Sequence, residues 1–343
     1  MYSIKILIYS LIWAYCLILA LPNTSQANIH KKDSLPTKVS FLTPSPTLHK
    51  GRFWSLTATA TTAYTATVIG LNQVWYAGYP RSNFHFFNDW NTWRQMDKMG
   101  HAYTAYFESK LVTDLYRWSG VDSINSAIIG AASGMIFQTT LEMLDAYSTQ
   151  WGFSIGDVAF NTMGASLFLG QELFWKEQRI RMKLGFHRPQ YATTPIQALN
   201  SSEYTSLDAR ARQLYGNSIS SLLFKEYNGQ TIWASVNIAA FLPQKPKYLP
   251  NWLNIAFGYG IENIFGAERN VWQNENGSTF MANPKDYPRL SQYYFSLDID
   301  FERIKTNKRW LKTVFKFLNI FKFPFPTLEL NSQGKFKVHA LYF

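Results

Sequence analysis

Charged residues are scarce in this chain of 343 residues. Asp, Glu, Lys and Arg make up 16% of it, against about 25% in an average soluble domain. Because 47% of the residues are apolar and 17% are aromatic, a disordered chain, a coiled coil and a collagen-like repeat are excluded. The mean hydropathy of -0.17 excludes a carrier built mostly of apolar membrane helices. The composition favours a membrane-associated or sheet-rich protein of one large or two smaller domains.

An export signal is predicted at the start of the chain. An uncharged apolar run, 6–21, is followed by Ser25 and Ala27, small residues that are typical of a cleavage site. The pattern predicts a secretory signal peptide over residues 1–27. The alternative is a single anchoring helix, although the run is short for a membrane span.

Cysteine occurs once, at Cys16, inside this apolar run. Trp13, Ala14 and Tyr15 precede it, in place of the small residues of a lipoprotein signal, so we do not expect lipidation. Once the signal is removed the chain has no cysteine. Disulfides, thiolate catalysis and cysteine-ligated metals are then excluded.

Several enzyme motifs are also missing. The sequence has no P-loop, no dinucleotide-binding glycine motif and no HExxH, which are the signatures of common nucleotide-binding proteins and zinc proteases. The net charge of +11 raises the question of nucleic acid. Because the chain is predicted to be exported, we expect anionic membrane phospholipid as the partner and no nucleic acid.

The first half of the sequence predicts helices. Residues 28–52, with three prolines and several Ser, Thr and Lys, predict a flexible linker. Residues 53–177 predict a helical bundle, in which the uncharged stretch 53–80 either spans a bilayer or forms a central buried helix. Three further helices are predicted, at about 97–118, 126–147 and 155–175.

The second half, 178–343, predicts strands, because apolar and polar residues alternate between clusters of Gly, Pro and Asn. The alternating segments are 178–187, 231–241, 253–265, 292–303 and 335–343. Residues 302–322 instead predict a basic amphipathic helix, which either lies in a membrane surface or packs on the sheet. We therefore predict an α+β fold: an N-terminal helical bundle packed on a C-terminal antiparallel sheet or partial barrel.

Polar residues form stripes on three of the predicted helices, since residues three, four, seven and eleven apart share a helix face. Most of their neighbours are apolar or small. If the stripes face one another, they form one buried polar network. Its predicted members are Asp97, His101, Glu108, Gln138, Glu142, Asp145, Asp157 and Asn161.

Three roles fit these stripes. As a catalytic site, His101, Asp97 and Glu142 would do acid–base chemistry, since clustered buried carboxylates have raised pKa values. As a metal site, Glu142, Asp145 and Asp157 would hold a hard divalent cation such as Mg²⁺ or Ca²⁺. As a structural network, the same groups would join the helices through hydrogen bonds. Solvated helix faces are a further alternative.

Several phrases of the sequence resemble a known family. DKMGH at 97–101, the E-x-x-D of Glu142 and Asp145, and WGFSIGDVAFNTMGA at 151–165 resemble the YfiM-like family of predicted periplasmic proteins, a domain of unknown function. KEYNGQTIWAS at 225–235 and later phrases resemble its longer Bacteroidetes-type form. The same polar spacing is distantly similar to the VanZ-like membrane family.

The resemblance implies export and a location in the periplasm or at the outer membrane of a Gram-negative bacterium, and it implies no established activity. We therefore expect a membrane-associated envelope protein with a structural or interaction role. The alternative is a membrane-proximal hydrolase or transferase that acts on a lipid or lipid-linked headgroup through His101 and the clustered carboxylates.

Overall fold

The structure, a computed structural model, describes residues 40–73 and 80–343. The predicted signal peptide 1–27 and Cys16 lie outside the described residues. The chain divides into two compact units. Unit 1 comprises the described residues up to Asn88 together with Thr104–Gln178 and Lys308–Thr313, and unit 2 comprises Asp89–Tyr103, Arg179–Asn307 and Val314–Phe343. With helices in the first half and an antiparallel sheet in the second, the predicted α+β class is confirmed.

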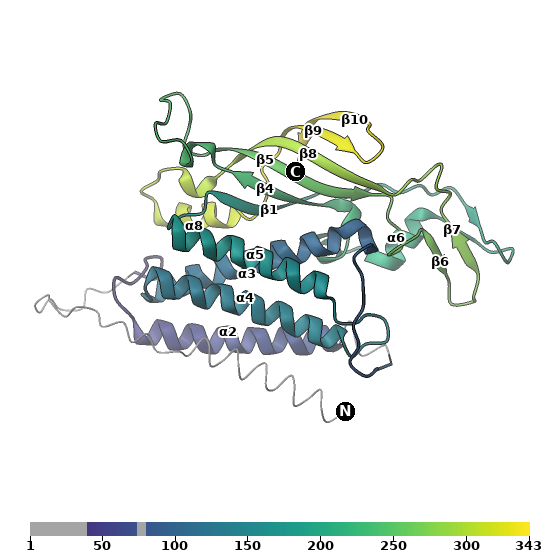
Figure 1. Cartoon of the computed structure of the whole chain (residues 1–343), viewed down its shortest axis with the longest axis horizontal. Helices are drawn as coiled ribbons and strands as arrows, with labels where there is room; N and C mark the ends of the chain where they lie inside the picture. Colours follow the sequence, from purple (N-terminus) through teal and green to yellow (C-terminus); the bar gives the residue numbers. More distant parts are fainter. Residues whose placement is uncertain (1–39, 74–79) are drawn as a thin grey trace, which may run out of the picture. The chain divides into compact units, whose positions relative to one another are not determined.

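Among the described residues, four long helices occupy the first half of the chain (Figure 1): α2 (Lys50–Leu71), α3 (Met96–Ser119), α4 (Ser123–Asp145) and α5 (Ile155–Phe174). The last three follow the predicted spans closely. The first one differs, because α2 begins inside the predicted linker and ends well before residue 80. Its start is set by His49, whose Nδ1 accepts a hydrogen bond from the Arg52 N–H at 3.2 Å and so caps the helix.

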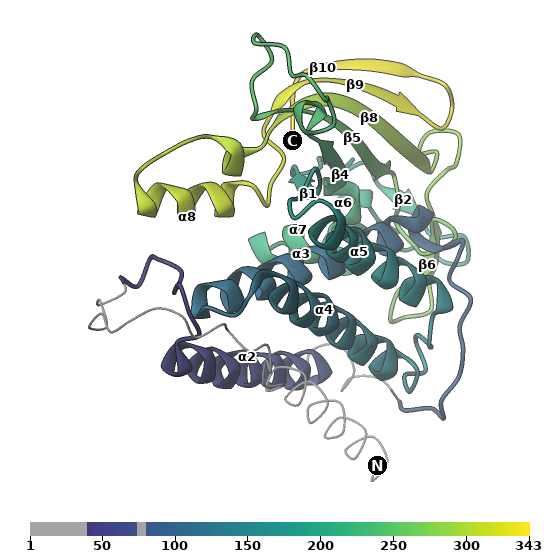
Figure 2. The same ribbon diagram turned by 60° about the vertical axis from the view of Figure 1, so that its left-hand side comes forward.

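Helix α2 is a member of the bundle. Its buried residues, Phe53, Thr57, Tyr64 and Val68, follow helical spacing along one face. The hydroxyl of Thr57 is hydrogen-bonded to that of Tyr116 at 3.0 Å, and Tyr64 is hydrogen-bonded to Thr140 at 2.6 Å. Figure 2 shows α2 running beside α4. These contacts within the protein explain the position of α2, and no contact with a bilayer is needed to explain it.

A different helix has the length and composition of a membrane span. Within the described residues, Ser123–Asp145 alone meets both criteria. Because 56% of its apolar window is buried inside the protein, it has the character of a core helix.

Helices α3 and α4 approach closely through small residues. A Cβ atom added at Gly130 would lie 2.1 Å from the Thr113 Oγ1 and 2.3 Å from the Ser109 carbonyl oxygen. The Thr113 hydroxyl already donates to the Ser109 carbonyl at 2.7 Å. Only glycine therefore fits at this crossing, which is the packing that the run of small residues in α4 indicates.

Unit 2 is built on a six-stranded antiparallel sheet of order β1-β4-β5-β8-β9-β10 (Figure 1). Its strands are β1 (Ile180–Phe186), β4 (Gln230–Val236), β5 (Leu253–Glu262), β8 (Leu290–Ile299), β9 (Phe325–Asn331) and β10 (Phe336–Tyr342). Two small hairpins accompany it, β2 (Ile196–Gln197) with β3 (Tyr204–Thr205) and β6 (Val271–Gln273) with β7 (Thr279–Met281). Short helices α6 (Leu207–Tyr215) and α7 (Ile219–Phe224) lie between β3 and β4 in the chain.

Two sequence predictions in this half were wrong. The helix expected over 302–322 is limited to α8 (Arg309–Leu318), because residues 319–320 form a turn and Phe321 then lies along β1. There the Leu184 N–H donates to the Ile320 carbonyl at 3.1 Å, and the Lys322 N–H donates to the Leu184 carbonyl at 3.0 Å. Strand β9 was not predicted, since prolines at its start discourage a strand assignment.

The sheet curls so that its first and last strands meet at one end. A Cβ atom added at Gly185 of β1 would lie 2.3 Å from the carbonyl oxygen of Phe343. The Tyr342 hydroxyl is 3.4 Å from the Thr231 Oγ1 of β4 and 2.8 Å from the Tyr294 hydroxyl of β8. The side chains that point inward are therefore enclosed, although the hydrogen-bonded ladder remains open between β1 and β10.

The polarity of this sheet is inverted. Its inward side carries buried charged and polar residues, among them Lys183, Ser235, Asp298 and Glu329. Its outward side is apolar, as in the row Phe257, Phe295, Leu328 and Val338 across four neighbouring strands. A sheet with one solvated face normally has the opposite arrangement.

We predict that Gly130→Ala lowers the free energy of unfolding by about 1–3 kcal/mol, because the added methyl group overpacks the crossing of α3 and α4. Gly170→Ala is the matched control. A Cβ atom at Gly170 meets nothing within 4 Å, so this change should raise stability by about 0.5–1 kcal/mol through helix propensity. Urea unfolding of the purified chain measures both. Equal effects of the two substitutions would contradict the close approach.

Candidate functional site

Two of the predicted polar residues of unit 1, Glu142 and Asp157, are linked through Ser154 where α4 ends and α5 begins. Glu142, almost fully buried, accepts a hydrogen bond through its Oε2 from the Ser154 N–H at 3.1 Å. The Ser154 hydroxyl in turn accepts from the Asp157 N–H at 3.0 Å and caps α5. Because Glu142 supplies the acceptor for the N-cap amide from a second helix, it performs part of the task of a capping box.

The other predicted residues of unit 1 differ in burial. Gln138 and Asn161 are buried, at 2% and 0% exposure. Glu108 and Asp145 are half-buried. Four of the predicted residues of unit 1, namely Gln138, Glu142, Asp157 and Asn161, are thus inside the protein, as the apolar neighbours of the stripes indicated.

Asp97 and His101 belong to unit 2 and are half-buried. The Tyr227 hydroxyl donates to the Asp97 Oδ1 at 2.6 Å. This contact joins two phrases that the family resemblance singled out, DKMGH and KEYNGQ. The catalytic role of His101, Asp97 and Glu142 and the metal role of Glu142, Asp145 and Asp157 stay predictions.

The lysine of the DKMGH phrase is a residue that sequence reasoning missed. Lys98 is completely buried and forms an ion pair with the Asp89 carboxylate at 2.8 Å. It also donates to the Asp89 carbonyl at 3.2 Å. Lys98 shares a helix face with Ala102 and Ala105, and this was the available signal, since a fully buried lysine requires a partner.

A second polar cluster, which the sequence analysis did not identify, lies inside the sheet. Lys183 of β1 and Asp298 of β8 form an ion pair at 2.8 Å, and both are completely buried. The Ser235 hydroxyl donates to the Asp298 Oδ2 at 2.6 Å, and the Phe323 N–H donates to the Oδ1 at 3.0 Å. One carboxylate therefore joins three strands and the segment that leads into β9.

This cluster extends to the ends of the strands. Arg181 donates to Asp300 at 2.9 Å and pairs with Glu302 at 3.2 Å. The Asn319 side chain donates to the Asp300 Oδ1 at 2.9 Å and accepts from the Phe301 N–H at 3.1 Å. These bonds fix residues 300–302 and end α8, which explains why the predicted helix is shorter than its sequence pattern.

Burial changes the pKa values of both lysines in the cluster. Burial lowers the pKa of Lys183, and the neighbouring Asp298 carboxylate opposes this effect. Burial lowers the pKa of Lys322 from 10.5 to about 8, again against the attraction of Asp298. The ammonium group of Lys322 lies 5.0 Å from the centre of the Trp233 ring and 3.3 Å from the Ser296 Oγ.

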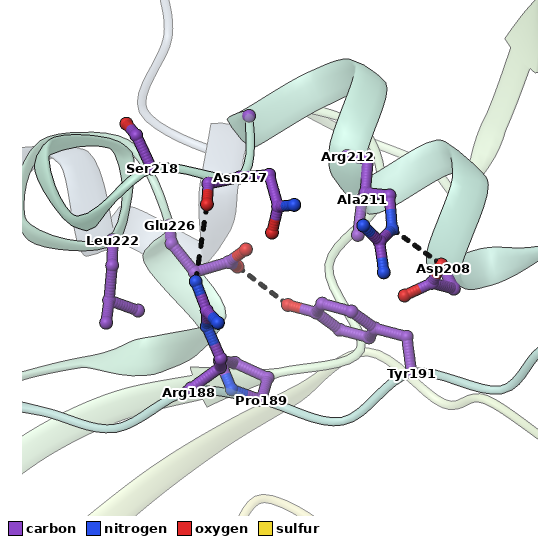
Figure 3. Close-up of a pocket in the computed structure, with 11 residues that line it drawn as sticks. Arg188, Pro189, Tyr191, Asp208, Ala211, Arg212, Asn217, Ser218, Leu222 and Glu226 are labelled. Atoms are coloured by element: carbon purple, nitrogen blue, oxygen red, sulfur yellow. Dashed lines mark hydrogen bonds and ion pairs between the residues drawn. The ribbon is translucent and has the colours of Figure 1, made fainter.

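A small pocket of about 120 Å³ opens beside α6 and α7 (Figure 3). Arg188 donates to the Asn217 carbonyl at 3.3 Å, and the Tyr191 hydroxyl donates to the Glu226 Oε1 at 2.6 Å. Arg212 pairs with Asp208 at 2.7 Å. Burial raises the pKa of Glu226. The lining carries two guanidinium groups together with the carboxyl groups of Asp208 and Glu226, so its charges do not select for an anionic molecule.

The comparisons with known proteins concern the helical part of the chain. Residues 85–170, from the segment before α3 to the last turn of α5, match the model of the family DUF2279, described as a predicted periplasmic lipoprotein. This segment is similar to that family, and the predicted YfiM-like resemblance is confirmed for it. No curated protein and no solved structure matches the chain. The distant VanZ-like resemblance stays a prediction.

The family match determines the location of the protein. The chain is an exported protein that is periplasmic or associated with the cell envelope. Its biochemical activity is not defined by the family.

We predict that Glu142→Ala lowers the free energy of unfolding by about 1–3 kcal/mol, because the Ser154 N–H loses its buried acceptor. Ser154→Ala should cost about 1 kcal/mol through loss of the N-cap. Gln150→Ala, at an exposed position of the same loop, is the control and should change stability by less than about 0.5 kcal/mol. Thermal melting measures all three. An unchanged melting temperature for Glu142→Ala would show that this network does not hold the helices.

We predict that stability rises with pH above about 8 and that Lys322 causes part of this rise. The unfolded chain binds the lysine proton up to its ordinary pKa of 10.5, whereas the folded chain binds it only up to about 8. Folding therefore releases a proton between these values, so the folded state gains stability as the pH rises. Lys183, whose pKa is also lowered, acts in the same direction.

Urea unfolding at pH 7.5 and 9.5 tests this pH dependence. The rise in stability should be smaller for Lys322→Met than for the unsubstituted protein. Lys335→Met, at an exposed lysine, should leave the rise unchanged. The same rise in all three proteins would show that Lys322 titrates normally in the folded state.

Proposed function

We propose that this chain is a non-enzymatic, membrane-associated protein of the cell envelope. In this proposal its buried polar groups hold the fold together, and helix α8 contacts anionic phospholipid. The proposal includes cleavage of the signal peptide after Ala27 and attachment to the outer membrane. The alternative role as a headgroup hydrolase or transferase, with His101 as base, stays a prediction.

The observation that carries the proposal is an apolar stripe on α8 that remains exposed. Trp310, Val314, Phe317 and Leu318 are between 38% and 61% exposed. Their spacing of four, three and one places them on one face of the helix. The folded protein leaves this face uncovered, although burying it would stabilise the chain.

A separate edge of the same helix packs on the protein. Phe315 is half-buried, and its ring centre lies 5.9 Å from that of Phe301. Within the stripe, the ring centre of Phe317 lies 5.9 Å from that of Phe321, yet Phe317 remains 61% exposed. An interfacial helix has such a second apolar face.

The charges around α8 favour an anionic surface. Lys308, Arg309, Lys312 and Lys316 are exposed on the side of the helix opposite the stripe. The sequence from residue 304 to 328 has six basic residues and no Asp or Glu. Lysine and arginine near a bilayer surface contribute about 1 kcal/mol each with anionic lipids. An apolar stripe beside these residues matches the hydrocarbon and the phosphates of a phospholipid surface.

The buried polar groups support the non-enzymatic part of the proposal. Glu142, Asp298 and Asp300 accept hydrogen bonds from backbone or side-chain donors of neighbouring elements. Each of these carboxylates joins two or more segments of its unit. Such an arrangement serves packing, since a buried carboxylate must be paired or hydrogen-bonded to be tolerated.

We predict that the purified chain without its signal peptide floats with vesicles of phosphatidylethanolamine and phosphatidylglycerol in a density gradient. Trp310→Ser combined with Phe317→Ser should abolish or strongly reduce flotation, because the stripe loses its two aromatic residues. Ile219→Ser combined with Phe224→Ser, at exposed apolar positions of α7, is the matched control and should float like the unsubstituted protein.

Vesicles of phosphatidylcholine alone and a series of salt concentrations complete this experiment. Binding should be weaker to the zwitterionic vesicles and should fall with salt, since exposed charges are screened. Equal flotation of both double variants would refute the assignment of α8 as the contact.

A further inference from the structure

The outward face of the sheet in unit 2 forms a second exposed apolar surface, on four neighbouring strands. Eight of its side chains are 40% exposed or more. They are Phe257 of β5, Tyr293, Phe295 and Leu297 of β8, Leu328 and Leu330 of β9, and Phe336 and Val338 of β10. We call this surface the outer sheet face.

The residues of the outer sheet face are adjacent across the strands. Phe257 pairs with Phe295, Phe295 with Leu328, and Leu328 with Val338. A second row joins Tyr293 to Leu330 and Leu330 to Phe336. The surface is therefore continuous, and it contains no ionised side chain in either row.

Two acidic residues of the same strands, Asp298 and Glu329, are enclosed on the other side. Asp298 lies between Leu297 and Ile299 in β8 and is completely buried in its ion pair with Lys183. Glu329 lies between Leu328 and Leu330 in β9 and is 5% exposed, with His339 at 2.5 Å. Water as the only solvent does not explain this distribution, because it would favour charges outside and leucines inside.

A hydrocarbon environment explains it. Strands β5, β8 and β9 are paired on both sides, so their backbone N–H and C=O groups need no water over most of their length. Apolar side chains outward and polar side chains inward is the pattern of strands in contact with lipid. We propose that the outer sheet face lies in the hydrocarbon of an anionic phospholipid bilayer, an inference that rests on the membrane attachment proposed above.

Charge favours a bilayer over a second copy of the chain as the occupant. Phe315 of α8 packs on Phe301, which lies two residues beyond the end of β8. The exposed Lys316 of α8 therefore lies near the end of that strand. A bilayer has phosphates next to hydrocarbon. The phosphates match the basic residues of α8, and the hydrocarbon matches the outer sheet face. A second copy would bring another chain of net charge +11 against the same basic segment.

Environment-sensitive labels on single cysteines test the proposal. In a chain without its signal peptide, and hence without Cys16, Leu328→Cys and Val338→Cys place a nitrobenzoxadiazole label at two partnered positions of the outer sheet face. Phe317→Cys labels the stripe of α8. Ser202→Cys, in the exposed connection between β2 and β3, is the control. Circular dichroism of each labelled protein confirms that it is folded.

The labelled proteins are mixed with vesicles of phosphatidylethanolamine and phosphatidylglycerol, with and without nitroxide groups on the acyl chains. We expect blue-shifted emission and strong nitroxide quenching at Leu328→Cys and Val338→Cys, and neither effect at Ser202→Cys. A response at Phe317→Cys without one at the two sheet positions would overturn this inference and leave the proposed attachment through α8 intact.

Two further outcomes are informative. If neither Phe317→Cys nor the sheet positions respond, the membrane attachment and the inference both fail. A blue shift at Leu328→Cys that needs no vesicles and increases with protein concentration, together with a dimer in sedimentation, would show that a second copy covers the face. That result would also overturn the inference.

Discussion

The buried ion pair between Lys183 and Asp298 is the interaction on which the sheet depends. Two ions without water are tolerated only when their partners and remaining hydrogen bonds are fixed. Asp298 meets this condition through Ser235 and the Phe323 N–H, and thereby ties β1, β4, β8 and the start of β9 together. Because the charges occupy the inside, the apolar residues of the alternating strands must point outward.

In unit 1, buried polar and small residues fix how the helices pack. Glycine at residue 130 lets α4 approach α3, and Glu142 holds the amide at the start of α5. In both units, acidic side chains inside the protein fix where an element begins or ends, as Asp300 does for α8 by accepting a hydrogen bond from Asn319. Buried polar groups thus define the boundaries of elements, and exposed apolar groups remain for contact with other molecules.

The periodicity of the sequence predicted most of the elements but not their sidedness. Helical spacing located α3, α4 and α5, and alternation located β1, β4, β5, β8 and β10, because these signals depend only on local geometry. Alternation cannot show which side of a strand is enclosed, so the partnership of Lys183 with Asp298 could not be predicted. The burial of Glu142 and Asp157 could be predicted from the sequence, since the neighbours of both residues along their helices are apolar. The length of α8 could not be predicted from the sequence, because the end of the helix depends on Asp300, which is distant in the chain.

The central claim is that apolar side chains of the sheet enter a membrane while its ion pairs stay inside the protein. Neutron reflectometry measures this directly, with the chain bound to a supported bilayer of phosphatidylethanolamine and phosphatidylglycerol that carries deuterated acyl chains. The structure predicts protein density within the acyl-chain layer on the side of addition. Protein density confined to the headgroup and water layers would contradict the claim.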